Sequence, residues 1–321
     1  MFRNAVWPYL VMLYLAMLCL AALLPAQSRV ALQAAAARAH TSHDPDPTVR
    51  NPDWLADRFL GPDEIAMLDN HPIARAVNQD YRIANLDPDV VAVSRSVLVR
   101  TRFIDQRLER ALRDGAAQLV IFNAGLDSRA YRFRALLQGK RVIEIDDAVT
   151  QALKKRRVVE VLGALPPHVT YAQALSSAGY RPGERTFFIW ENSVHTPEST
   201  VRETLRTISQ AAPGSALVMD FVWKSLLDKT ARDPAAPQSR WDAKIYGEPW
   251  QFAVPDGRSE AFFRSLGLEL RETLETNSTE AEKRYLTRRD GSHFGPLPNA
   301  PGSGFEDFLG VVCAELTPQS K

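Results

Sequence analysis

The sequence predicts an α/β fold with a mostly parallel β-sheet, helices on both of its faces, and a hydrophobic helix at the N-terminus. Two observations predict the sheet. Short, almost wholly apolar segments alternate with segments of helical length through the middle of the chain, and strands that are apolar throughout are typical of parallel sheets covered on both faces. The third observation is an uncharged run of 20 residues, Ala5–Leu24.

This apolar run is the first element. As a helix, Ala5–Leu24 has a length of about 30 Å, the hydrocarbon thickness of a bilayer. Arg3 precedes it and Pro25 follows it. We expect residues 1–27 to form a membrane anchor, with a cleaved signal peptide or a mis-assigned start codon as the alternatives. Charges on the two sides of the run balance, so the orientation in the membrane stays open.

The remaining residues, 28–321, are expected to form one α/β domain, because their length suits a single large core. Apolar residues at helical spacing and cap residues predict the helices, and continuous apolar runs predict the strands. The expected helices are Ser28–Ala39, Asp53–Leu60, Asp89–Asp114, Ala148–Leu162, Thr196–Ala212 and Ser259–Gly267. The expected strands are Gln118–Phe122, Arg141–Asp146, Thr186–Glu191, Ser215–Val222, Leu268–Glu275 and Gly310–Leu316.

Composition excludes several classes of function. The chain has 39 Lys and Arg against 38 Asp and Glu, a net charge of +1. It therefore lacks the basic excess expected of a nucleic-acid-binding protein. Cys19 and Cys313 are its two cysteines, which excludes a disulfide framework and a thiolate zinc site. We predict no metal site.

Ligands of parallel α/β sheets bind beyond the carboxyl ends of the strands. The first such turn holds Asn123 and Gly125, and Asp146 follows the next strand, 21 residues after Gly125. A glycine turn with an acid at this spacing is typical of nucleoside-type cofactor sites. The alternatives are a glycine needed only for a tight turn and a solvated Asp146, with Asp147 as the helix cap. No Gly-x-Gly-x-x-Gly motif is present, which argues against a nicotinamide dinucleotide.

A third strand end carries Glu191, Asn192 and His195 within five residues. A carboxylate, an amide and an imidazole so close together suit a catalytic group, and His195 is the side chain that ordinarily titrates near neutral pH. The alternative is that Glu191 and His195 only cap neighbouring turns. Ser193 has no Gly-x-Ser-x-Gly context, so a hydrolase triad is disfavoured.

With these residues in place, the chain resembles the leucine carboxyl methyltransferase-like family of S-adenosylmethionine-dependent enzymes. The most specific match is RTRFIDQRLERALRDGAAQLVIFNAGLDSRAYRF (Arg100–Phe133). Supporting matches are Ala31–Ala39, Val142–Arg157, Phe187–Glu191, Ala212–Phe221 and Gly247–Pro255. The resemblance covers about residues 28–321. It implies a Rossmann-like class I methyltransferase fold and S-adenosyl-L-methionine as the cofactor.

The resemblance also implies roles for single residues. Arg100 corresponds to an arginine near the methionine carboxylate of the cofactor, and Glu191 to a residue that lines the same side. Asn123 and Gly125 correspond to the cofactor-binding turn, and Asp146 to the ribose-binding acid. His195 is then the candidate catalytic base, beside Glu191.

The chain departs from the family pattern at three places, and the first two fall in the same pocket. The family's Asp-Leu pair at the adenine is replaced by Ala172-Gln173, in a segment about ten residues short. The family's Glu-Gly-x-x-x-Tyr-Leu segment becomes ENSVHTPE (Glu191–Glu198), without the glycine and the tyrosine. A turn glycine is replaced by Asn123. This clustering indicates an altered site.

The sequence therefore predicts an O-methyltransferase that acts on a small-molecule carboxylate or hydroxyl, with no nucleic-acid partner and with membrane contact through residues 5–24. The alternatives are a methyltransferase-fold enzyme that now catalyses an elimination or a cyclisation, and a membrane-tethered binding module. Because the cofactor is an intracellular metabolite, the methyltransferase hypothesis favours a cytoplasmic catalytic domain.

Overall fold

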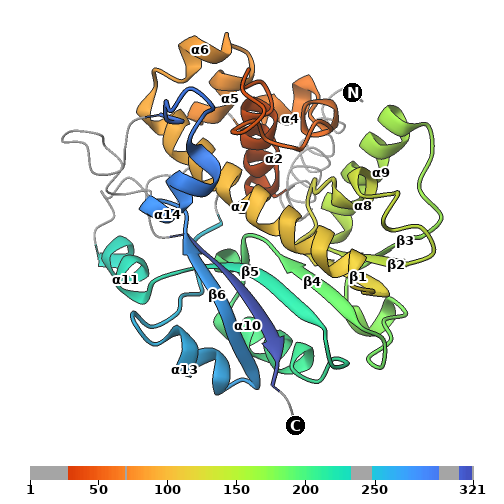
Figure 1. Ribbon diagram of the computed structural model, residues 1–321. Helices are drawn as coiled ribbons and strands as arrows, with labels where there is room; N and C mark the ends of the chain where they lie inside the picture. The colour runs from red at the N-terminus through yellow and green to blue at the C-terminus, as the bar shows by residue number, and fades with distance from the viewer. Residues whose placement is uncertain (1–27, 69–70, 233–247, 296–310, 320–321) are drawn as a thin grey trace, which may run out of the picture.

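The computed structural model describes residues 28–68, 71–232, 248–295 and 311–319 (Figure 1). Within them lies a seven-stranded sheet of order β3-β2-β1-β4-β5-β7-β6. Strands β1 to β5 run parallel, and β7 is antiparallel to both β5 and β6. The predicted mostly parallel sheet is confirmed. The strands are β1 (Gln118–Phe122), β2 (Arg141–Ile145), β3 (Val169–Ala172), β4 (Thr186–Trp190), β5 (Ala216–Val222), β6 (Leu268–Glu275) and β7 (Val311–Pro318).

Alternation of side chains along the strands divides the core between the two faces of the sheet. Leu119 and Ile121 of β1 pack in one apolar cluster, and Val120 and Phe122 pack in the other. The first cluster is covered by α2 (Arg29–Thr41), α7 (Pro88–Arg113), α8 (Arg129–Arg132) and α9 (Ala148–Leu162), and the second by α10 (Glu198–Ile208) and α13 (Ser259–Arg264). Both faces are thus buried, as continuous apolar strands require.

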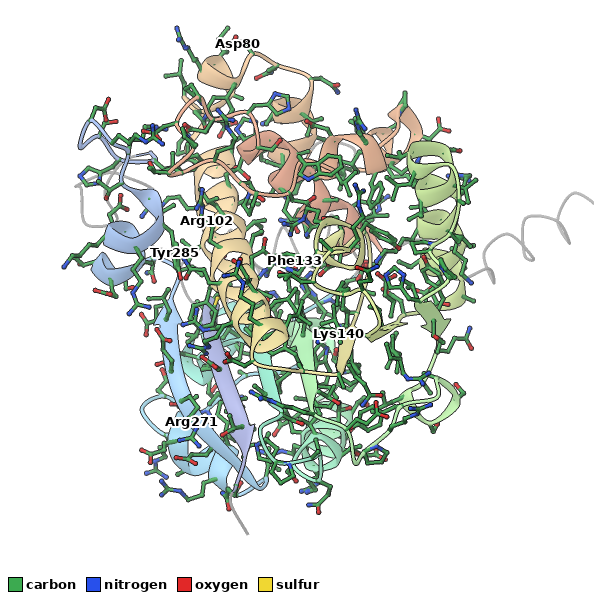
Figure 2. All side chains as sticks on the ribbon, turned by 45° about the vertical axis from the view of Figure 1, so that its right-hand side comes forward. Asp80, Arg102, Phe133, Lys140, Arg271 and Tyr285 are labelled. Atoms are coloured by element: carbon green, nitrogen blue, oxygen red, sulfur yellow. The ribbon has the colours of Figure 1, made fainter. Side chains whose placement is uncertain are left out.

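Short helices form a cap at the carboxyl ends of the parallel strands. Figure 1 shows α2 to α6 gathered near α14, which follows the end of β6, and Figure 2 shows Asp80 at the outer tip of this cap. The shorter helices are α3 (Ala56–Phe59), α4 (Pro62–Ala66), α5 (Pro72–Val77), α6 (Tyr81–Ala84), α11 (Lys224–Arg232), α14 (Thr279–Ala281), the 3-10 turns η1 (Leu175–Ser177) and η2 (Ser193–His195), and the π-helical turn η4 (Glu282–Leu286).

The helix boundaries differ from prediction where local backbone chemistry intervenes. The predicted helix from Thr196 begins only at Glu198, because Thr196 precedes a proline and is extended, with φ −90° and ψ 138°. The helix predicted over Asp53–Leu60 is reduced to four residues, since the Asp53 side chain accepts a hydrogen bond from the Leu55 N–H in a turn.

The predicted anchor, residues 5–24, lies outside the described residues. None of the helices in the described part of the chain combines the length and apolarity needed to cross a membrane.

One buried ion pair joins β2 to α9. Lys154 Nζ lies 2.7 Å from Glu144 Oε2, and both side chains are fully buried. Lys154 also donates a hydrogen bond to the carbonyl of Ala124, in the turn after β1. Burial raises the pKa of Glu144 to about 7, although Lys154 acts to lower it. The helix is thereby fixed to the strand whose end carries Asp146.

Replacement of this lysine should make stability fall more steeply with pH. In Lys154→Met the carboxyl of Glu144 loses its partner, so its pKa in the folded state rises above the parent's value of about 7. The loss of stability relative to the parent therefore grows only as pH rises past 7, by at most about 1.4 kcal/mol per pH unit. Urea unfolding at pH 5 and pH 8 measures it.

The double variant Glu144→Gln/Lys154→Met removes both buried charges, so its stability should not fall further as pH rises from 5 to 8. Lys224→Met, which breaks an exposed pair with Asp228, should change stability by less than about 1 kcal/mol at either pH. Equal losses for Lys154→Met at both pH values would show that Glu144 stays ionised without its lysine.

Candidate functional site

The turns after β1 and β2 meet at the carboxyl edge of the sheet. Asp146 Oδ2 accepts a hydrogen bond of 2.6 Å from the Gly125 N–H, and its Oδ1 accepts one of 2.8 Å from the Asp147 N–H. Asn123 and Gly125 both have left-handed backbone conformations, with φ of 48° and 41°. The structure therefore brings Asn123, Gly125 and Asp146 into one constellation, and Asp147 separately caps α9.

Burial raises the pKa of Asp146 to about 6, and the neighbouring Asp147 adds to the effect. The hydrogen bonds from the N–H groups of Gly125 and Asp147 lower this pKa, but by less than burial raises it. A carboxylate that is partly desolvated and held by only two backbone donors keeps free acceptor capacity, because each ionised carboxylate offers about four lone-pair sites. Such a group can accept hydrogen bonds from the hydroxyls of a ligand.

Helix α2 lies directly on this turn. A Cβ atom placed at Gly125 would be 2.9 Å from the Cβ of Ala31, so only glycine fits there. The hollow between α2 and the turn has a volume of about 10 Å³ and is lined by Ala31, Ala34, Arg38, Ile121, Phe122, Asn123, Ala124, Gly125, Leu126, Asp127, Glu191 and Asn192. Sites for small molecules usually measure about 300–1,000 Å³. The space between α2 and the turn is therefore nearly filled.

Glu191, at the end of β4, is the centre of a buried cluster of charges. Its carboxylate lies 3.1 Å from Arg129 Nη2, 3.8 Å from Arg100 Nε and 3.7 Å from Arg38 Nη1. All four side chains are buried. Arg100 also donates a hydrogen bond of 2.7 Å from Nη1 to Asp220 Oδ2. Although burial alone would lower the pKa of Arg100, the carboxylates of Glu191 and Asp220 raise it, so the guanidinium stays charged.

One polar atom of this cluster stays unsatisfied. Arg100 Nε is shut off from solvent and has no hydrogen-bond partner among the described residues. A buried donor of this kind costs about 1–3 kcal/mol. An incoming carboxylate oxygen would supply the missing acceptor.

Arg129 and its acidic partners were not predicted from the sequence. Arg129 donates from Nε to Asp105 Oδ1 and from Nη1 to Asp127 Oδ2, each at 2.6 Å. Arg38 was missed as well, and it donates to Asp53 Oδ2 and to the carbonyl of Leu126. The available signal was a charged residue inside an otherwise apolar segment, as for Arg38 in an alanine-rich helix, because such residues are buried only when paired.

His195 lies on η2, directly after β4. Its Nδ1 is 2.6 Å from the backbone carbonyl of Glu248. Because a carbonyl only accepts, Nδ1 carries the proton, and the neutral ring presents its lone pair at Nε2. Burial lowers the pKa of His195. The imidazole is therefore neutral at pH 7, as a general base must be before it takes a proton.

Two contacts connect η2 to the rest of the site. The side chain of Asn123 donates a hydrogen bond of 3.4 Å to Thr196 Oγ1, next to His195. The carboxylate of Glu248 accepts hydrogen bonds from Ser28 Oγ and from the N–H of Arg29, at the N-terminus of α2. One residue, Glu248, thus orients the histidine through its backbone and holds α2 through its side chain.

The end of β3 holds no carboxylate. Ala172 ends the strand and Gln173, which follows it, is exposed. The carbonyl of Ala172 accepts a hydrogen bond from the Gln151 side chain. The short loop to β4 contains only the 3-10 turn η1. The strand end that the resemblance aligns with the family's Asp-Leu pair therefore carries no acidic side chain at Ala172 or Gln173.

The model of a known family, described as leucine carboxyl methyltransferase, matches residues 31–209 of the chain. The chain belongs to this leucine carboxyl methyltransferase family. The match includes α2 from residue 31 onward, the turns after β1 and β2, and the end of β4 with η2. The residues placed at the site above therefore lie in the part of the chain that defines the family, except Ser28, Arg29, Asp220 and Glu248.

Curated relatives agree with the family assignment. A protein of Streptomyces coelicolor, named as an inferred S-adenosyl-L-methionine-dependent methyltransferase, is 30% identical over 172 residues, which are 50% of this chain and 60% of that protein. A Streptomyces avermitilis protein named in the same way is 28% identical over the same shares. The alignments thus span about 60% of the length of these relatives.

Among solved structures, an inferred methyltransferase of Thermobifida fusca YX has a TM-score of 0.49 and 15% identity, with 82% of this chain and 94% of that chain covered.

The residues of the site fit the polar ends of S-adenosylmethionine, the cofactor of this family. Asp146 has free acceptor capacity for the two ribose hydroxyls. The unsatisfied Nε of Arg100 suits the methionine carboxylate. No acid is present for the adenine amino group at Ala172-Gln173. The donor and acceptor set therefore fits the ribose and methionine parts of the cofactor.

Ionisation of Asp146 should lower the stability of the folded protein. Because the folded-state pKa of Asp146 is about 6, its ionisation destabilises the folded protein, and the cost grows as pH rises from about 4 to above 6. Asp146→Asn keeps an acceptor for Gly125 and removes the charge. We expect it to raise the free energy of unfolding at pH 8 by about 1–3 kcal/mol, and by less at pH 5. Urea unfolding measures the difference.

Asp147→Asn is the matched control. Partial burial raises the pKa of Asp147, but hydrogen bonds from the side chain and backbone of Thr150 lower it overall. Its neutralisation should therefore lower stability at pH 8, the opposite sign to Asp146→Asn. The same sign for both variants would contradict the assignment.

Proposed function

We propose that the chain is an S-adenosylmethionine-dependent O-methyltransferase that acts on a small-molecule carboxylate or hydroxyl. The observation that carries the proposal is the Asp146 carboxylate bonded to the Gly125 N–H at 2.6 Å, which joins the turns after β1 and β2. In a family of methyltransferases this is where the ribose hydroxyls find an acceptor. The catalytic domain comprises residues 28–321 in this proposal.

The residues divide by the part of the reaction they serve. Asp146, Gly125 and Asn123 hold the nucleoside, and Arg100 pairs with the methionine carboxylate. Glu191 keeps Arg100 and its neighbours charged and in position. When bound, the cofactor supplies an electrophilic methyl group on sulfur. The protein mainly has to align the acceptor oxygen with that methyl group, because a well-oriented displacement needs little more.

His195 is the candidate base for a hydroxyl acceptor. The new bond forms between the acceptor oxygen and the methyl carbon as the carbon–sulfur bond breaks, and the hydroxyl proton passes to His195 Nε2. The Glu248 carbonyl fixes the ring with the proton on Nδ1 and so leaves Nε2 free to accept it. A carboxylate acceptor has no proton to lose, and its transfer needs no base.

In this proposal α2 covers one side of the cofactor turn. Arg38 holds it there through Asp53 and the carbonyl of Leu126, and Ala31 packs on Gly125. The hollow of about 10 Å³ between α2 and the turn does not include Asp146, so the nucleoside binds beside this hollow, along Asp146.

A second candidate function is a methyltransferase-fold enzyme that has lost methyl transfer and catalyses an elimination or a cyclisation. Two observations favour it: the nearly filled space between α2 and the turn, and the missing acid at the adenine side. His195 with Glu191 would serve that chemistry as a proton-transfer group. Cofactor binding separates the two candidates.

Calorimetric titration of S-adenosylmethionine into the full chain tests the proposal first. We expect micromolar affinity, and a loss of about 1.5–3 kcal/mol of binding free energy in Asp146→Ala, because the lost hydrogen bonds are to a charged group. Asp290→Ala, an exposed aspartate of the loop before residue 291, is the control and should bind like the parent. Absence of binding at millimolar cofactor in a cooperatively folded protein would favour the second candidate.

Substitution of His195 tests the base. With a hydroxyl acceptor, His195→Gln should lower turnover by about 10²-fold or more while cofactor affinity is unchanged. With a carboxylate acceptor, turnover should stay within a few-fold. His43→Gln, an exposed histidine paired with Asp57, is the matched control. Loss of turnover and of cofactor binding together would assign His195 a structural role.

Since S-adenosylmethionine is made inside cells, the same proposal places the catalytic domain in the cytoplasm, whatever residues 5–24 do. Labelling of exposed lysines in intact cells with a membrane-impermeant reagent would reveal a domain on the other side.

A further inference from the structure

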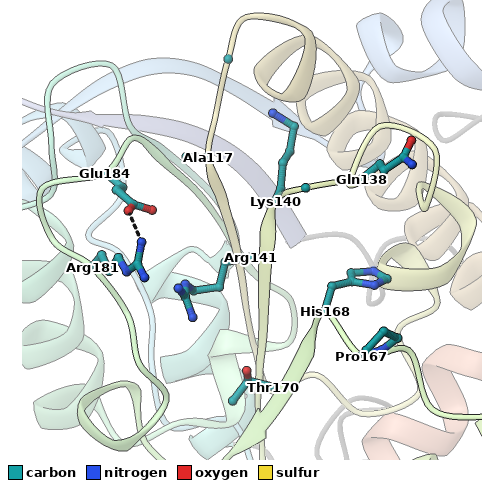
Figure 3. Close-up of a pocket in the computed structure, with 11 residues that line it drawn as sticks. Ala117, Gln138, Lys140, Arg141, Pro167, His168, Thr170, Arg181 and Glu184 are labelled. Carbon is teal, nitrogen blue, oxygen red and sulfur yellow. Dashed lines mark hydrogen bonds and ion pairs between the residues drawn. The ribbon is translucent and has the colours of Figure 1, made fainter.

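A second cavity lies at the opposite edge of the sheet from the cofactor turn, at the amino ends of β1, β2 and β3. Its volume is about 630 Å³, within the usual range for sites of small molecules. Figure 3 shows its residues, which come from the segments before β1 and β2, from the start of β3 and from the loop before β4. The charged residues that line it are Lys140, Arg141, Arg181 and Glu184.

Arg141, the first residue of β2, and His168 are lining side chains with unfilled hydrogen-bonding capacity. Of the two, only Arg141 is always charged at neutral pH. Its Nε is closed to solvent and has no hydrogen-bond partner among the described residues. Its Nη1 lies 3.7 Å from where a Cβ of Gly179 would be. In Figure 3 the guanidinium extends toward the loop that carries Arg181 and Glu184. A guanidinium that is partly buried without a partner is costly unless a ligand completes its bonds.

The loop across from Arg141 is fixed rather than loose. The buried side chain of Gln118 donates a hydrogen bond of 2.8 Å from Nε2 to the carbonyl of Arg181, and its Oε1 accepts one of 3.1 Å from the Arg181 N–H. Gln118 also bonds to the hydroxyl of Thr186. The backbone of Arg181 is thus attached to β1, and the cavity is built before any ligand arrives.

The charges favour an anion. Three cationic side chains face one carboxylate, that of Glu184, which already pairs with Arg181 at 2.7 Å. Lys140 donates a hydrogen bond to the carbonyl of Ala116, so its charge adds to the field while its position is fixed. Thr170 adds a hydroxyl on the same lining. A phosphoryl group suits cations that approach from different segments, because its three terminal oxygens point in different directions, whereas a carboxylate fills one fork.

We propose that this cavity binds the phosphoryl group of a small phosphorylated molecule, with Arg141 as the principal ligand and Arg181 and Lys140 as supporting charges. The site is distinct from the cofactor turn, which lies at the carboxyl ends of the same strands. Its volume exceeds what inorganic phosphate needs, so the organic part of the ligand occupies the remainder.

Calorimetric titration of inorganic phosphate into the full chain, at constant ionic strength, tests the proposal. We expect saturable binding that Arg141→Gln weakens at least about ten-fold, because a charge-assisted fork is lost. Arg181→Gln, at an exposed position, should weaken it by about three-fold. The matched control is Arg271→Gln, an exposed arginine on β6 (Figure 2), which should bind phosphate like the parent.

The thermal midpoint without phosphate checks that Arg141→Gln folds. It should equal or exceed that of the parent, since the guanidinium Nε of Arg141 has no protein partner to lose. Heats that match a chloride titration, or equal affinity in Arg141→Gln and the parent, would overturn the proposal. Succinate that binds as tightly as phosphate would overturn the choice of a phosphoryl group. None of these outcomes depends on S-adenosylmethionine binding.

Discussion

The buried carboxylate of Glu191 is the constraint on which the carboxyl edge of the sheet depends. An ionised group that leaves water loses several kcal/mol of solvation, so it must be paired and hydrogen-bonded. Here Arg38 from α2, Arg100 from α7 and Arg129 from α8 all approach it. Since each arginine belongs to a different helix, satisfying one carboxylate fixes the positions of three helices against the end of β4. Removing any one of these arginines would leave buried carboxylate charge without full compensation.

The carboxyl edge of the sheet also contains polar groups that lack a charge partner or a hydrogen-bond partner. Asp146 is partly desolvated with only backbone donors, which raises its pKa to about 6, and Arg100 Nε has no acceptor. Elsewhere in this cluster acids and bases are matched at 2.6–2.8 Å, as for Arg129 with Asp105 and Asp127. Polar groups that lack the hydrogen bonds or charge partners that their neighbours have commonly mark a functional site. The mismatches therefore support a ligand at Asp146 and Arg100.

The sequence was sufficient for six of the seven described strands, all but β3, and for the first turn, and insufficient for the charge network. β1 and β6 have the predicted bounds, because continuous or alternating apolar patterns are local. The spacing of Gly125 and Asp146 placed both at one edge, since parallel strands end together. Arg38 is hydrogen-bonded to Asp53 and Leu126, which are 15 and 88 residues away in the sequence. The periodic pattern of apolar residues does not indicate such distant pairs. The position of α2 on the turn depends on them and could not be predicted.

The contacts of α2 determine how a ligand can open the site. While α2 is docked, Arg38 is hydrogen-bonded to Asp53 and lies 3.7 Å from Glu191, and Glu248 caps the helix. A ligand shifts a conformational equilibrium only by its difference in affinity between the two states. The space between α2 and the turn after β1 is only about 10 Å³, so a ligand group that enters beneath α2 must favour a conformation in which Arg38 is freed. Because Glu248 also orients His195, displacement of α2 and placement of the base are coupled through one residue.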